Sequence, residues 1–72
     1  MKKTEILFLE SAILDLIDNN NKVDISDILD YLDYINKVRY KEEDIKPILK
    51  KLVKEKRIMI INDFYLKGGK VL

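Results

Sequence analysis

Three lysines stand at four-residue spacing in the second half of the chain: Lys46, Lys50 and Lys54. In a helix, residues four apart lie on the same face, so this spacing predicts one row of ammonium groups. Such a row attracts phosphate oxygens, with a strong dependence on salt concentration. Lysine is poorer than Arg, Asn or Gln at reading base edges, so the row predicts phosphate contacts with weak sequence preference.

The distribution of charge supports this interpretation. Residues 1–36 carry three lysines against eight carboxylates, a net charge of −5, whereas residues 37–72 carry eleven basic side chains against five acidic ones, a net charge of +6. A lysine row opposite an apolar stripe also keeps any helix soluble, and a merely solvated face remains the alternative. The residues predicted to contact DNA are Lys46, Lys50, Lys51, Lys54, Arg57 and Lys67.

An acidic row precedes the basic one. Asp24, Asp27, Asp30 and Asp33 recur every three residues along the predicted second helix and its start. If this helix crosses near a DNA backbone, the row would repel phosphate. In one interpretation Asp27 favours a helix N-terminus and the other carboxylates face solvent. In the other, Asp27, Asp30 and Asp33 form a docking surface for a basic protein partner or for the basic half of the same chain.

Other chemistry has little support in the composition. The 72 residues contain neither Cys nor His, so the commonest zinc ligands and the commonest general base are missing. Aliphatic hydroxyls occur only at Thr4, Ser11 and Ser26, with no suitable base to activate them. We therefore expect no catalytic residue, metal site or cofactor. Acidic residues interrupt the first apolar segment, which predicts a cytoplasmic protein without a signal peptide or membrane span.

The elements that must position these residues follow from periodicity. With 47% hydrophobic residues, the chain predicts a single domain over residues 1–72, mainly helical with a small β-hairpin. A first helix is expected over 4–18 with Thr4 as its N-cap, then an extended piece at 23–25. A second helix follows over 27–36, with Ser26 as its N-cap.

The third helix is expected over residues 43–56, where apolar residues recur at helical spacing: Ile45, Ile48, Leu49, Leu52 and Val53. Pro47 lies early in this segment and predicts an irregular or kinked first turn. Residues 58–61 and 64–66 then form a tight hairpin around Asn62-Asp63. Residues 68–72 are expected to be a loose tail.

The order helix, short strand, helix, helix, hairpin resembles the winged-helix superfamily. The segment EEDIKPILKKLVKEKRIMIINDFYL, residues 42–66, is similar to the recognition helix and wing of that superfamily. Leu49, Leu52, the basic corner Lys56-Arg57 and Ile58 carry the likeness, which extends back through Ser26 to Thr4. Among known relatives the chain looks most like small archaeal winged helices, including the C-terminal domains of archaeal replicative helicases.

The resemblance implies that the third helix presents its exposed face to the DNA major groove. Our first hypothesis is therefore a double-stranded DNA-binding domain without enzymatic activity. The alternative is a protein-interaction winged helix, an adaptor or accessory domain of a larger assembly that uses the acidic face of its second helix. Under either hypothesis the domain is a monomer or a homodimer, and Phe8 and Leu14 of the first helix would be the dimer contact if they are exposed, which the pattern does not decide.

Overall fold

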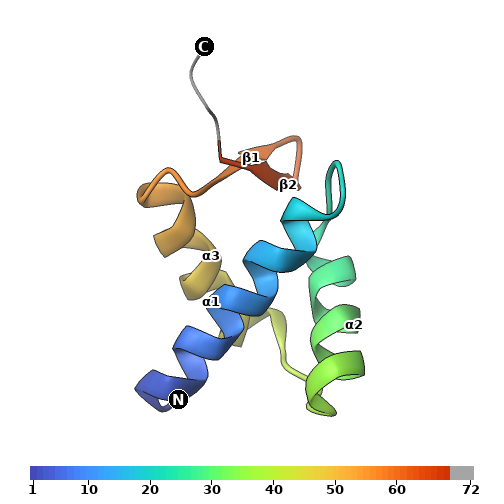
Figure 1. Cartoon of the computed structure of the whole chain (residues 1–72), viewed down its shortest axis with the longest axis vertical. Helices are drawn as coiled ribbons and strands as arrows, with labels where there is room; N and C mark the ends of the chain where they lie inside the picture. The colour runs from blue at the N-terminus through green and yellow to red at the C-terminus, as the bar shows by residue number, and fades with distance from the viewer. Residues whose placement is uncertain (69–72) are drawn as a thin grey trace.

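The computed structural model describes residues 1–68 and contains three helices followed by a two-stranded hairpin (Figure 1). Helix α1 spans Lys3–Asp18, α2 spans Ile25–Asn36 and α3 spans Glu42–Lys54. Strands β1 (Ile58–Ile61) and β2 (Phe64–Lys67) form the hairpin, which we call the wing. The fold is mainly helical with a small β-hairpin and has the layout of a winged helix, as the sequence predicts.

The wing is an antiparallel pair with Ile61 opposite Phe64 and Ile58 opposite Lys67. Its two turn residues, Asn62 and Asp63, have φ values of 52° and 67°. Two left-handed central residues are the signature of the type I′ turn, which matches the twist of the flanking strands. Asn and Asp tolerate this region, and the predicted two-residue turn is confirmed.

A single residue outside the hairpin extends its sheet. The N–H of Val23 donates to the carbonyl of Tyr65 (3.0 Å), and the N–H of Tyr65 donates to the carbonyl of Val23 (2.7 Å). The extended piece predicted at 23–25 is confirmed at Val23, whereas Ile25 already belongs to α2. Strand β2 is therefore bonded on both sides, and β1 is the edge strand.

The core lies where α1 packs against α2, α3 and the wing (Figure 1). It is almost entirely aliphatic, which suits a small domain that must bury a dense core. Tyr40 is its aromatic member. The Tyr40 hydroxyl donates to Glu5 Oε2 and accepts from Asn36 Nδ2, both at 2.9 Å, and burial raises the Tyr40 pKa. The fully buried side chains are Leu9, Ile13, Ile17, Ile28, Leu32, Ile45, Leu49, Leu52 and Ile58.

Both predicted N-caps are wrong. Helix α1 begins at Lys3 with Lys2 as its N-cap, so Thr4 lies inside the first turn. Helix α2 is capped by Asp24, two residues before Ser26. Asp24 Oδ1 accepts from the Asp27 N–H (2.8 Å), and Asp27 Oδ2 accepts from the Asp24 N–H (3.1 Å). This reciprocal pair satisfies two N–H groups at once, which the single hydroxyl of Ser26 could not do.

The cap assignment predicts unequal effects for two neighbouring substitutions. Asp24→Ala removes the capping acceptor and should lower the free energy of unfolding by about 1 kcal/mol. Ser26→Ala changes an exposed side chain and should stay within about 0.5 kcal/mol of the wild type. Urea unfolding followed by circular dichroism measures both values. Equal effects from the two variants would contradict the assignment.

Helix α3 also starts earlier and ends earlier than predicted. It is helical from Glu42 without interruption through Pro47 and stops at Lys54, so the expected irregular first turn is wrong. Asp44 Oδ2 accepts from the Lys41 N–H (3.1 Å) and closes the first turn. Pro47 deprives the Glu43 carbonyl of a helical partner, but both residues are exposed, and water can replace the missing donor.

The end of the wing is held at Gly68. Its N–H donates to the Arg57 carbonyl at 2.9 Å. A Cβ at this position would collide with the backbone of Lys56 and Arg57, so the close approach of the two strands requires glycine. The predicted tail thus begins after a bonded residue, and its remaining part, residues 69–72, lies outside the described residues.

Candidate nucleic-acid interface

The structure places Lys46, Lys50 and Lys54 together on the exposed side of α3. We call these three residues the basic row. Lys46 pairs with Glu42 one turn earlier, with 3.7 Å between Nζ and Oε1. Lys50 and Lys54 make no ion pair within residues 1–68. The two C-terminal ammonium groups of the row are therefore free to meet an anion, and the first is held only by a weak surface pair.

A groove of about 730 Å³ opens between α3 and the wing, and the basic row lines it. We call it the wing groove. The rest of its lining is mostly apolar: Leu49, Val53 and Pro47 come from α3, and Ile60 and Tyr65 come from the wing. Glu43 adds the single carboxylate of the lining. The predicted lysines thus border an apolar floor and do not form a continuous charged face.

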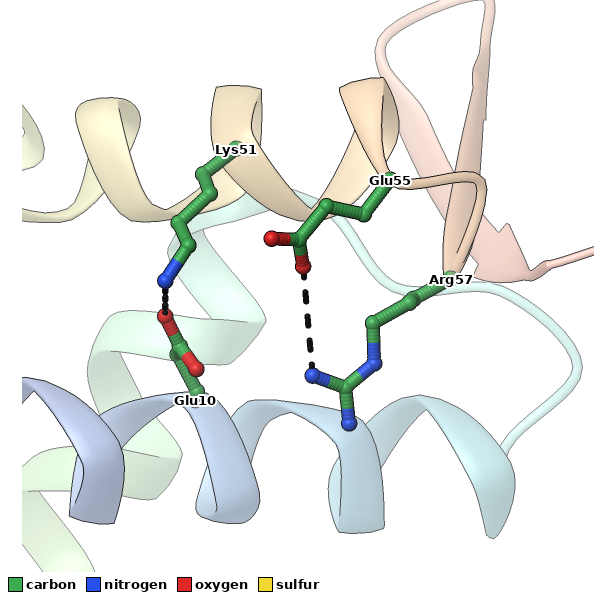
Figure 2. Close-up of polar contacts among 4 residues, drawn as sticks. All are labelled: Glu10, Lys51, Glu55 and Arg57. Atoms are coloured by element: carbon green, nitrogen blue, oxygen red, sulfur yellow. Dashed lines mark hydrogen bonds and ion pairs between the residues drawn. The ribbon is translucent and has the colours of Figure 1, made fainter.

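Lys51, which the sequence also predicts to contact DNA, instead pairs with a nearly buried carboxylate of α1 (Figure 2). Its Nζ lies 2.8 Å from Oε2 of Glu10 on α1, whose side chain is only 7% exposed. The hydrogen bond and the charge of Glu10 raise the Lys51 pKa. A nearly buried carboxylate needs such a partner, because an unpaired charge in the interior is strongly unfavourable. Lys51 is therefore a structural link between α1 and α3.

Arg57 and Lys67, the two predicted residues at the base of the wing, line a different site. Both face a cleft of about 350 Å³ beside the C-terminal half of α1. Lys67 Nζ lies 2.9 Å from Oδ1 of Asp18. Arg57 Nη1 lies 4.0 Å from Oε1 of Glu55 (Figure 2). The six predicted residues therefore divide into the basic row, one core link and two paired residues in a separate cleft.

The carboxylates of α2 are largely engaged. Asp27 belongs to the capping pair with Asp24, and Asp33 Oδ2 lies 3.3 Å from Nη2 of Arg39. Asp30 is exposed and forms no ion pair among the described residues. Of the three acids proposed as a protein-docking surface, one is free, which weakens the α2 face as a continuous acidic site.

The start of α3 carries negative charge where a recognition helix usually approaches base edges. Glu42, Glu43 and Asp44 are all exposed in its first turn. These carboxylates favour the helix N-terminus through the helix dipole, but they repel phosphate. Any contact of α3 with a polyanion is therefore best served by the C-terminal half of the helix, where Lys50 and Lys54 lie.

The predicted dimer contact on α1 is only half present. Phe8 is exposed, whereas Leu14 is half-buried and packs against the core. The two residues therefore do not form one exposed apolar surface.

Sequence reasoning missed the apolar part of the wing groove. Ile60 is 47% exposed and lines the groove, although the pattern of β1 gave no indication of which way it points. Four consecutive apolar residues, Ile58-Met59-Ile60-Ile61, show no alternation between buried and exposed types. The available signal was the complete lack of charge in an edge strand, because edge strands usually carry charged side chains.

Two further findings limit the chemistry of the described part of the chain. Within residues 1–68, no three side chains of the His, Cys, Asp or Glu types converge as metal ligands. No helix among these residues has the length and apolar character needed to cross a membrane. Comparison with family models, with curated proteins and with solved structures finds no match to this chain.

Proposed function

We propose that this domain binds double-stranded DNA through the basic row of α3, with little sequence preference. The observation that carries the proposal is the alignment of Lys46, Lys50 and Lys54 on one exposed side of the helix, beside the wing. An α-helix of about 10–12 Å diameter fits the major groove, which is about 12 Å wide. Phosphates on the groove walls then lie within reach of long, flexible ammonium side chains.

The pairing pattern supports a choice among the predicted contact residues. Lys50 and Lys54 have no competing carboxylate within residues 1–68, and the Lys46–Glu42 pair is of the surface type worth about 0.3–0.5 kcal/mol. Phosphate can replace such a partner. Lys51 stays with Glu10, and Arg57 and Lys67 act only at the margin. A small number of phosphate contacts implies modest affinity for the duplex. The domain is proposed to act in the cytoplasm.

The salt dependence of binding tests the proposal. Three phosphate contacts predict a slope of about −2.7 for the logarithm of the association constant against that of salt concentration. A fourfold rise in salt should then lower affinity roughly 40-fold. The measurement is fluorescence anisotropy of a labelled random-sequence duplex over a salt series. A flat response, or no binding at low salt, would refute DNA binding through this row.

A further inference from the structure

The floor of the wing groove has no role in phosphate binding. Val53, Pro47 and Ile60 place apolar surface directly beside the basic row. A helix face that serves solubility alone has no need of an exposed apolar floor, and phosphate contacts use only the lysines. Exposed apolar surface with a charged rim is typical of a protein-binding site.

We propose that the wing groove docks an acidic amphipathic helix of a protein partner. Its apolar face would cover Ile60, Val53 and Pro47, and its carboxylates would meet the basic row. This inference goes beyond DNA binding and does not depend on it, because it adds an apolar contact that the DNA proposal does not use. Charge selects the partner: the rim carries three lysines and one carboxylate, Glu43, so a basic segment would be repelled.

The spacing of the lysines matches a helix more closely than a strand. Residues four apart on α3 rise about 6 Å along its axis, and the whole basic row covers about 12 Å. Carboxylates at four-residue spacing on a second helix repeat with the same period, so all three pairs can form together. Three alternate residues of a strand span about 13.2–13.6 Å, which exceeds the length of the basic row by about 1.2–1.6 Å and fits it less closely.

The proposed partner and a DNA duplex would compete for the same three lysines. Each ammonium group can serve a carboxylate or a phosphate, but the two macromolecules cannot occupy one helix face together. The partner helix therefore acts as an inhibitor of DNA binding wherever both are present. Its additional apolar contacts make it less sensitive to salt than the duplex.

Ile60→Thr tests the floor, and Ile61→Thr is its matched control. The two isoleucines are adjacent in β1 and similarly exposed, at 47% and 51%, and successive strand residues point to opposite faces. The probe is a synthetic helical peptide with leucines on one face and glutamates at four-residue spacing along one flank. Titration of the 72-residue chain, followed by amide NMR shifts, should place the peptide at Val53, Ile60 and Tyr65.

We expect Ile60→Thr to weaken peptide binding by at least about fourfold, the effect of one buried CH2 group, because the substitution removes a methyl group and puts a hydroxyl in place of a methylene. Ile61→Thr should leave peptide affinity unchanged, and a peptide with glutamine in place of glutamate should bind more weakly to the wild type. Absence of peptide binding at low salt would overturn the proposal. So would equal weakening by the two variants, or shifts centred away from the wing groove.

Duplex affinity, measured on the same variants, separates this inference from the DNA proposal. Ile60→Thr retains all three lysines and should change duplex affinity by less than about twofold. If the duplex weakens and the peptide does not, the floor serves DNA and the docking proposal is wrong. If the wild type fails to bind DNA but binds the peptide at the wing groove, the docking proposal stands alone.

Discussion

Replacing Lys46, Lys50 and Lys54 together with glutamate is expected to lower duplex affinity by at least about 100-fold at low salt. Each substitution removes an attraction for phosphate and adds a repulsion beside Glu42 and Glu43, which already face solvent on α3. The fold should persist, because all three side chains are exposed. Fluorescence anisotropy with the random-sequence duplex measures the loss, and circular dichroism checks the helix content.

A second triple variant controls for net charge. Lys2, Lys3 and Lys22 are the only lysines of residues 1–36, and they do not line the wing groove. Changing them to glutamate alters the net charge of the chain by the same amount. We expect the duplex affinity of this control variant to stay within about threefold of the wild type when both triple variants are also compared at about 0.1 M salt, where the Debye length is about 10 Å and distant charges are screened. A similar loss in both variants would mean that overall charge, and not the basic row, controls binding.

Leu52→Ala is expected to lower the free energy of unfolding by about 3 kcal/mol, because it leaves a cavity in a fully packed core. Leu52 is completely buried on the inner side of α3. A domain of this length has a total stability of roughly 4–11 kcal/mol, so the loss is a large fraction of the whole. Thermal unfolding should show a Tm decrease of about 12–24 °C.

Leu7→Ala provides the matched comparison, since it makes the same change on an exposed helix face. Leu7 lies in α1 and is 54% exposed. Its replacement should change stability by no more than about 0.5 kcal/mol. If the two leucine variants melted at the same temperature, the placement of α3 against the core would be incorrect, and so would the outward orientation of the basic row.

The elements of this fold were predictable because their signals are local. The apolar stripe of α3 has one helical period, and Asn62-Asp63 is a pair that tolerates the left-handed turn. The helix starts were less predictable. Asp24 and Ser26 are both good capping residues two positions apart, and only the reciprocal bond between Asp24 and Asp27 decides between them.

The candidate site was only partly predictable, because contacts between residues far apart in the chain decide which basic side chains are paired. Glu10 and Lys51 are far apart in the chain, and no local pattern shows that Lys51 pairs with Glu10 and is not available for phosphate. The same holds for Asp18 and Lys67. The groove floor combines α3 with one face of a uniformly apolar strand, and periodicity cannot select a face where every residue is apolar.

The double hydrogen bond between Val23 and Tyr65 has a consequence for the energetics of recognition. It joins strand β2 to the segment that leads into α2. The hydrogen bond from the Gly68 N–H to the Arg57 carbonyl joins the two ends of the wing. The wing side of the wing groove, which carries Ile60 and Tyr65, is therefore preorganised. A ligand that enters beside α3 meets a wing that is already in place, so little affinity is lost to ordering. A freely hinged hairpin would have to be ordered on binding, at a cost in affinity.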